Sequence, residues 1–267
     1  MGLVAVLAAS CSSGDDGVPS DVTERLSAAV DEIEGADGLH VEMRFLSYDE
    51  GRPGTADEPD AATCVAASFE PAGTSEAGER LHMNFGAPHE DYDNYGCLLG
   101  STFTVDGTLV YAHTDEHAPG TSYGLLSRVG ETTPELIAEM SALETGSGVE
   151  LANLVESASG VEEVDDTVVF DLDPDEVAER APPEAATDEP ADTVTLTATY
   201  DPDAGDRLTS LGYEITAGDA TVLLTYYYDA YDEPQDVEVP VAPYITPEVT
   251  RLTTLDELAA FVGLGPT

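Results

Sequence analysis

Apolar residues recur along this chain with two periods, one typical of helices and one typical of strands. From residue 21 to 34 they lie three or four positions apart, which predicts an amphipathic helix. Asp21 and Glu24 stand at the spacing of a capping box at its start, and Gly35 is placed to end it. After this helix, apolar and polar residues alternate, which predicts half-buried strands.

The alternating segments form two groups, one on each side of the middle of the chain. Asp106-Gly107 between two such segments is a strong signal for a two-residue hairpin turn. Glycine, proline and aspartate gather in several of the stretches between the segments, as they do in surface loops. The predicted strands cover residues 39–45, 63–69, 80–85, 97–105, 108–113, 167–172, 194–200, 207–216 and 221–228.

Helical periodicity returns in the middle of the chain and at its end. Thr132 and Glu135 form a second capping-box pattern, with Pro134 in the first turn. Residues 149–157 and 254–262 carry further apolar stripes at helical spacing. The order of helix, strands, helices and strands predicts an α+β fold in which helices cover one face of an antiparallel sheet.

The first residues resemble a bacterial lipoprotein signal. The apolar run 3–9 leads through small residues to Cys11, and a tether rich in Gly, Ser and Asp follows. In such signals the cysteine becomes the lipidated N-terminus, and stable anchoring takes two or more acyl chains such as palmitate. No Lys or Arg precedes Arg25, although signals begin with a basic region, so we expect the natural start to lie upstream. Alternatively, the apolar N-terminus packs on the domain and Cys11 is a buried thiol.

The charge balance restricts the partners. The chain has 55 acidic and 8 basic residues, a net charge of -47. Such a surface repels phosphates and anionic headgroups, which argues against nucleic acid as a partner. Salt would screen the self-repulsion, so we hypothesise a salt-adapted source. A calcium-binding surface is the alternative, but no EF-hand pattern occurs. No later run reaches the ~20 apolar residues of a membrane span, so the N-terminus is the expected attachment.

Two cysteines remain beside Cys11. Cys64 and Cys97 suit a disulfide in an oxidising compartment. A bridge across a loop of this length would contribute roughly 3.5 to 4 kcal/mol in the chain-entropy model. The alternative is two reduced, buried thiols, and the spacing matches no zinc motif.

Other chemistry finds little support in the sequence. His113 and His117 lie four apart, but Asp115 and Pro119 indicate a loop, whereas a His-x-x-x-His pair shares a face only on a helix. His82 and His89, seven apart, form no recognised metal motif either. No phosphate-binding Gly-Lys-Ser/Thr loop occurs. We therefore predict no catalytic residues, no metal and no cofactor, and rank an enzyme behind non-enzymatic functions.

Several stretches together resemble the LolA-like lipoprotein-carrier superfamily, including its LppX/LprG-type surface lipoproteins. They are LAASC, the helix leading into LHVEMRFLS, then ELANLVESASGVEEVDDTVVFDLD, and DRLTSLGYEITAGDATVLLTYYYDAYDEPQDVEVP. The resemblance covers most of residues 20–240 and implies an unclosed antiparallel half-barrel packed on helices, with an apolar cavity for acyl chains. The cysteine pair, the tail after Pro243 and the acidity depart from it.

This reading divides the chain into a signal remnant (1–10), a tether (11–19), a half-barrel domain (20–243) and a C-terminal extension with a short helix (244–267). We expect an extracytoplasmic lipoprotein, anchored to the outer face of the cell membrane, that binds or carries a lipid or other hydrophobic ligand. The alternative is an envelope interaction or sensor module whose core is closed. Protein partners are not indicated.

The candidate ligand-binding residues are large apolar or aromatic side chains at alternate strand positions. Tyrosines in such places present an apolar body and a polar tip, as in many ligand pockets. The competing interpretation is ordinary packing in the core, and for the tyrosines, methionines and phenylalanines among them it ranks ahead of a ligand-lining role. They are Met43, Phe45, Met83, Phe85, Leu224, Tyr226 and Tyr228.

Overall fold

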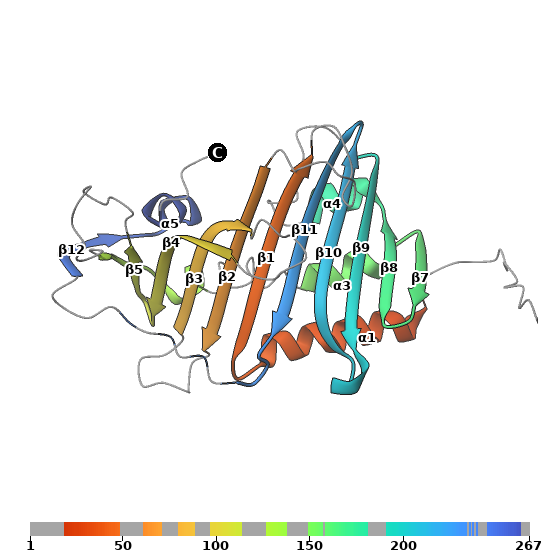
Figure 1. The fold of residues 1–267 in the computed structure, drawn as a ribbon, viewed down its shortest axis with the longest axis horizontal. Coiled ribbons are helices and arrows are strands. Elements are labelled where there is room, and N and C mark those ends of the chain that lie inside the picture. Colours follow the sequence, from red (N-terminus) through yellow and green to blue (C-terminus); the bar gives the residue numbers. More distant parts are fainter. Residues whose placement is uncertain are drawn as a thin grey trace, which may run out of the picture.

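A large open sheet with helices on one face makes up the fold (Figure 1). The strands lie in the order β12-β6-β5-β4-β3-β2-β1-β11-β10-β9-β8-β7, with β7 and β12 at the two edges. The computed structural model describes residues 19–48, 61–70, 80–88, 97–113, 127–137, 149–156, 158–180, 191–233, 235, 237, 239 and 245–262.

All neighbouring strands of this 12-stranded sheet are antiparallel except β12 and β6, which are parallel. The strands are β1 (Leu39–Tyr48), β2 (Ala61–Glu70), β3 (Arg80–Pro88), β4 (Cys97–Asp106), β5 (Leu109–His113), β6 (Ser127–Glu131), β7 (Gly160–Val164), β8 (Thr167–Leu172), β9 (Thr193–Asp201), β10 (Arg207–Ala217), β11 (Ala220–Asp229) and β12 (Ile245–Arg251).

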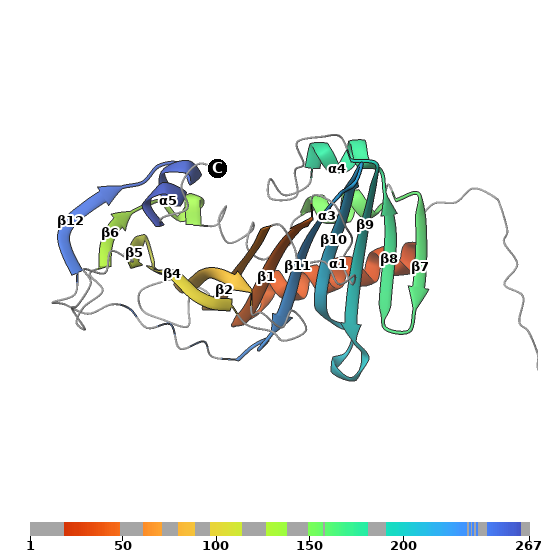
Figure 2. The same cartoon turned by 45° about the horizontal axis from the view of Figure 1, so that its top comes forward.

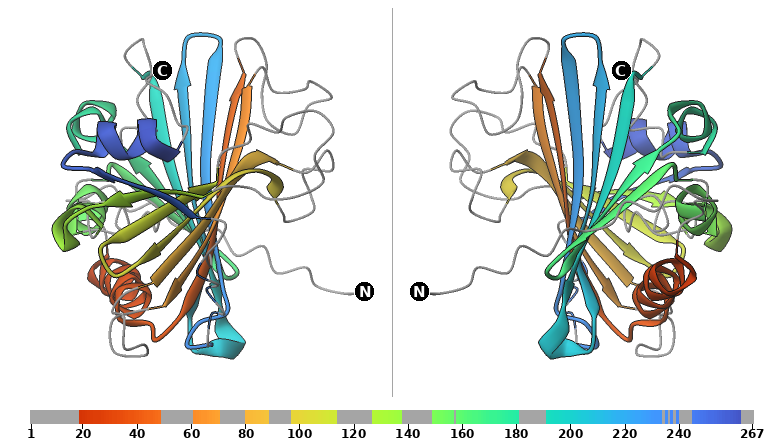
Figure 3. Two further views of the ribbon diagram at one scale, coloured as in Figure 1. Left: turned by 90° about the vertical axis from the view of Figure 1, so that its left-hand side faces the viewer. Right: turned by 90° about the vertical axis from the view of Figure 1, so that its right-hand side faces the viewer.

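The helices lie on the same side of the sheet, as the end-on views of Figure 3 show. We call the side that they cover the inner face. In Figure 2 one group lies over the β7–β11 end, and α5 lies over the opposite end. The described helices are α1 (Ser20–Gly35), α3 (Val149–Glu156), α4 (Pro174–Arg180) and α5 (Leu255–Val262), and a short 3-10 helix, η2 (Pro202–Ala204), joins β9 to β10. None of the helices described here is long and apolar enough to cross a membrane.

One hydrophobic core fills the space between the inner face and the helices. Along β9 every second residue is buried, from Val194 to Tyr200, and the threonines between them face the other side of the sheet. α1 contributes the apolar stripe that its periodicity predicts. The buried residues of α1 are Val22, Leu26, Ala29, Val30 and Ile33.

The predicted α+β architecture, an unclosed antiparallel sheet packed on helices, is confirmed. Two details of the predicted caps are wrong. Pro19 occupies the N-cap of α1 and no side chain caps the helix, because the helix begins at Ser20, one residue before the proposed capping residue Asp21. In the described turn after β6, the hydroxyl of Thr133, rather than that of Thr132, accepts the backbone N–H of Leu136 at 3.3 Å.

The segment predicted as a C-terminal extension adds a strand and a helix to this sheet. β12 pairs with β6, and Leu252, Leu258 and Phe261 belong to the buried core. A Cβ on Gly130 would lie 2.7 Å from Cδ1 of Leu252, so the glycine leaves room for this segment. The guanidinium of Arg128 donates to the Phe261 carbonyl at 3.2 Å and lies over its ring. Residues 245–262 are therefore packed as part of the fold.

Candidate ligand-binding face

The helices are concentrated at the two ends of the inner face. Among the described elements, α1 packs mainly on β10, α3 on β8 and α4 on β9, whereas α5 packs on β4 and β5. None of these helices makes its main contacts with β11, β1, β2 or β3. These four adjacent strands, which we call the central strands, form the middle of the sheet. Their inner face is the candidate ligand-binding face.

The central strands bring the sequence-predicted ligand residues together in register. Met43 on β1 lies opposite Tyr226 on β11, and two residues further along Phe45 lies opposite Leu224. These pairs share one face because the offset of two residues returns a strand to the same side. Tyr228 lies on the same side of β11, opposite Val41.

The remaining two predicted residues lie on β3. Met83 is opposite Ala67 of β2, and Phe85 is opposite Val65. Because Val65 is in turn opposite Met43, the register connects β3 to β1 through a buried valine. The side chain of Phe85 lies outside the part that the structure describes. The topology thus groups the predicted residues, and their role in binding stays a prediction.

These residues are packed against protein atoms. Met83, Leu224 and Tyr226 are fully buried, Met43 and Tyr228 nearly so, and Phe45 packs against the same core while half-buried. The rings of Tyr226 and Tyr228 stack with their centroids 6.5 Å apart. Burial raises the pKa of Tyr228 well above its usual value, so its phenol stays uncharged. The face is therefore apolar, neutral and closed in this structure.

The outer face of the same strands carries a polar cluster that the sequence analysis did not predict. Glu42 and Arg44 form an ion pair of 2.6 Å with side chains only 7% and 5% exposed. The guanidinium of Arg44 lies 5.3 Å from the centre of the Tyr227 ring. Alternation alone placed these charges on the solvent side of β1, and local sequence holds no signal for their burial.

Two histidines on the outer face pair with hydroxyl groups across neighbouring strands. Nδ1 of His40 lies 3.0 Å from Oγ of Ser68, and Nδ1 of His82 lies 2.9 Å from Oγ1 of Thr104. Within the described residues no group of three or more His, Cys, Asp or Glu side chains is placed to hold a metal ion. The sequence analysis considered the pairs His82/His89 and His113/His117 as metal ligands, and in both pairs the second histidine lies outside the described residues.

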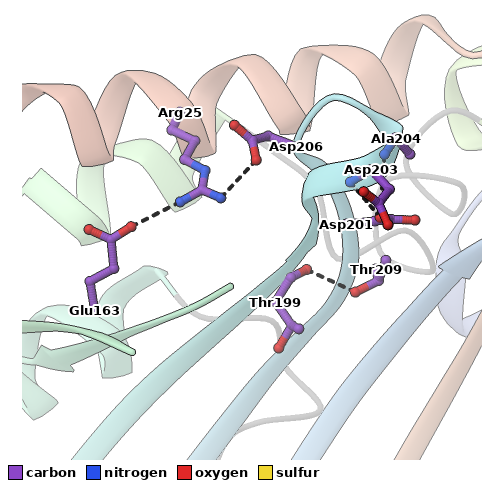
Figure 4. Close-up of polar contacts among 8 residues, drawn as sticks. All are labelled: Arg25, Glu163, Thr199, Asp201, Asp203, Ala204, Asp206 and Thr209. Atoms are coloured by element: carbon purple, nitrogen blue, oxygen red, sulfur yellow. Dashed lines mark hydrogen bonds and ion pairs between the residues drawn. The ribbon is translucent and has the colours of Figure 1, made fainter. Parts of the chain in front are cut away.

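Two arginines attach α1 to the sheet, again without a local sequence signal. Arg25 of α1 binds Glu163 of β7 at 3.1 Å and Asp206, just before β10, at 3.0 Å (Figure 4). Its guanidinium also lies 4.0 Å from the centre of the Tyr200 ring. These contacts fix the N-terminal half of α1 over the inner face.

Arg207 lies on β10 and binds the C-terminal half of α1. Its Nε donates to Glu32 of α1 at 2.6 Å, and Nη2 donates to Asp232 at 2.9 Å. The carboxylate of Glu32, through its hydrogen bond and charge, raises the pKa of Arg207, which stays charged. The turn that positions this region is built by Asp201, whose Oδ1 accepts the N–H groups of Asp203 and Ala204 (Figure 4).

The structure describes two of the three cysteines, Cys64 and Cys97. Cys64 is fully buried on β2, opposite Arg44 of β1, and Cys97 is the first residue of β4. A bridge between them stays a prediction. Cys11 and almost all of the predicted tether lie outside the described residues.

Comparison with known proteins gives no match to a family model and none to a curated protein. Among solved structures, the chain is similar to the lipoprotein LppX of Mycobacterium tuberculosis, with 13% identity, a TM-score of 0.42, and coverage of 82% of this chain and 99% of that one. The chain is also similar to LprF from Mycobacterium bovis, with 13% identity, a TM-score of 0.44, and coverage of 85% of this chain and 100% of that one. A LolA superfamily protein from Nitrosomonas europaea matches with 8% identity, a TM-score of 0.24, and coverage of 80% of this chain and 94% of that one.

Proposed function

We propose that this protein is a non-enzymatic, extracytoplasmic lipoprotein that binds a lipid or another hydrophobic ligand between the central strands and the helices. Cys11 would anchor it to the outer face of the cell membrane, and a Cys64–Cys97 bridge would brace β2 and β4. One observation carries the proposal. Apolar side chains continue in register across β11, β1, β2 and β3, where none of the described helices makes its main contacts.

Binding would require the covered face to open. Met83, Leu224 and Tyr226 are fully buried, so a ligand reaches them only where packing side chains or helices give way. Water disfavours an exposed apolar face, and an empty carrier would therefore close over it. The same burial favours a second candidate, an envelope interaction module with a permanently packed core. Adjacent residues on β2 offer a test that separates the two.

We expect the protein purified from its native membrane to retain a hydrophobic ligand in native mass spectrometry. Leucine at Ala67, which is buried on the inner face, should reduce the retained ligand about fivefold because it fills the ligand's space. Leucine at Ala66, which faces the other way, is the matched control and should leave the ligand in place. The packed core would instead be supported by two results together. The wild-type protein would carry no ligand, and Ala67→Leu would lower the free energy of unfolding by about 1–3 kcal/mol.

The anchor has its own measurement. Intact-mass analysis of the membrane fraction should find a chain that begins at Cys11 and carries two or three acyl chains, since a single chain gives only marginal membrane binding. Cys11→Ser should abolish the added mass and release the protein from membranes. An unmodified Cys11 in a chain that retains Met1 would contradict the anchor without touching the ligand.

A further inference from the structure

Two buried hydrogen-bond donors without acceptors meet beneath α1. Nε of Arg25 and the hydroxyl of Tyr200 are shielded from solvent and have no hydrogen-bond partner among the described residues. The guanidinium lies 4.0 Å from the centre of the Tyr200 ring, so the two donors belong to side chains that contact each other. The remaining atom of this kind in the described residues belongs to Thr132, after β6, toward the other end of the sheet.

Keeping these donors costs the folded protein free energy. Buried polar groups in proteins are almost always hydrogen-bonded, because water satisfies them in the unfolded chain. Burial raises the pKa of Tyr200 to about 12, so its hydroxyl holds its proton near neutral pH and can only gain by finding an acceptor. A phenylalanine would fill the same space in the core without this cost.

The charges around the donors define the missing acceptor. Arg25 already binds two carboxylates, those of Glu163 and Asp206, so its positive charge is compensated (Figure 4). Asp201 and Asp203 lie in the neighbouring turn, and the whole chain carries a net charge of -47. A further anion would face repulsion here. An uncharged oxygen, such as an ester carbonyl, ether or hydroxyl, satisfies donors without adding charge.

The donors lie in the core that continues from the candidate ligand-binding face, with β10 between β9 and the central strands. Tyr200 lies in the same buried cluster as Leu224, Tyr226 and the apolar stripe of α1. Because both atoms are shielded from water, an acceptor would arrive through the apolar interface between α1 and the sheet. We infer that Tyr200 and Arg25 form a subsite for an uncharged oxygen of the hydrophobic ligand, which selects neutral oxygen-bearing lipids over anionic ones. This inference rests on the proposed function.

The test compares three probes that differ at the polar end: glycerol monooleate, sodium oleate at pH 8 and 1-octadecene, each competing with Nile red for the wild-type protein. Glycerol monooleate should bind at least fivefold more tightly than oleate. Tyr200→Phe should weaken glycerol monooleate about fivefold and leave octadecene unchanged, because only the oxygen loses a donor. Without ligand, this variant should melt at or above the wild-type temperature.

Tyr231→Phe is the matched control, because the Tyr231 hydroxyl already donates to the Leu208 carbonyl at 2.7 Å. It should lower the ligand-free melting temperature by about 2–4 °C and affect the three probes equally. The subsite is overturned if Tyr200→Phe lowers the ligand-free melting temperature as much as Tyr231→Phe does. It is also overturned if Tyr200→Phe weakens the binding of octadecene as much as that of glycerol monooleate. If no probe binds the wild type, the proposed function fails together with the subsite.

Discussion

Alanine at Gly38 is expected to lower the free energy of unfolding by about 2–4 kcal/mol, far more than a typical glycine substitution outside regular structure. An added Cβ would lie 2.2 Å from the carbonyl oxygen of Glu233, much closer than such atoms approach in proteins. The obstacle is backbone, so no side-chain rotation relieves it. Urea or thermal unfolding of the two proteins measures the difference.

The effect is large because Gly38 connects α1 to the sheet at a tightly bonded crossing. The N–H of Asp232 donates to the Gly38 carbonyl at 2.8 Å, and Oδ1 of Asp232 accepts the N–H of Asp37 at 3.2 Å. The other carboxylate oxygen of Asp232 binds Arg207, which in turn holds Glu32 of α1. Moving the chain at Gly38 therefore disturbs the contacts that hold the C-terminal half of α1.

Gly35 supplies the control for this prediction. It is the last residue of α1, and an added Cβ there would meet no atom within 4 Å. Alanine favours helix over glycine by up to about 1 kcal/mol, so Gly35→Ala should be neutral or slightly stabilising. Equal stabilities for Gly38→Ala and the wild type would show that the crossing can relax, and would contradict the tight packing described here.

The sequence predicted the parts of the fold that local periodicity encodes. Strong alternation located the strands around the central face, and the helical spacing of Val22 to Ile33 located α1. Three strands escaped prediction. β6 and β7 are five residues long and lack an adjacent Asp-Gly turn, the signal that marks the equally short β5. β12 contains Pro247. Proline indicates a break in most sequence contexts but is tolerated on an edge strand, and β12 is an edge.

The candidate face was predicted better than its surroundings. Alternation shows that Met43 and Phe45 share a side of β1, and pairing with β11 then follows from the fold. The contacts that hold α1 were not predicted, because Arg25 lies 138 residues from Glu163 and 181 from Asp206. With 55 acidic residues in the chain, charge alone could not select those two. Partners so distant in sequence meet only after the sheet has formed.

Removing one member of the buried Glu42–Arg44 pair is expected to cost about 3–5 kcal/mol. Arg44→Met leaves the Glu42 carboxylate, 7% exposed, without the guanidinium that it contacts at 2.6 Å. Glu42→Leu removes the carboxylate that the guanidinium contacts at 2.6 Å, while the Tyr227 ring stays beside the guanidinium. Chemical unfolding of both single variants measures these costs.

The double variant separates the cost of breaking the pair from the value of having it. Buried ion pairs lose solvation on folding, and replacing both partners with apolar residues is often neutral or stabilising. Glu42→Leu/Arg44→Met should therefore unfold within about 1 kcal/mol of the wild type, which gives a coupling energy of several kcal/mol in the double-mutant cycle. Additive losses in the double variant would show that the two side chains act independently.

An exposed pair on the same sheet controls for simple loss of charge. Arg251 and Glu131 lie 3.9 Å apart with side chains 86% and 51% exposed. Arg251→Met should change the stability by no more than about 0.5 kcal/mol, because water and salt already screen this pair. Both Arg→Met variants make the net charge more negative by the same amount, so a loss confined to Arg44→Met must come from burial. Glu42 and Arg44 then behave as interior residues, although they lie on the outer face of β1.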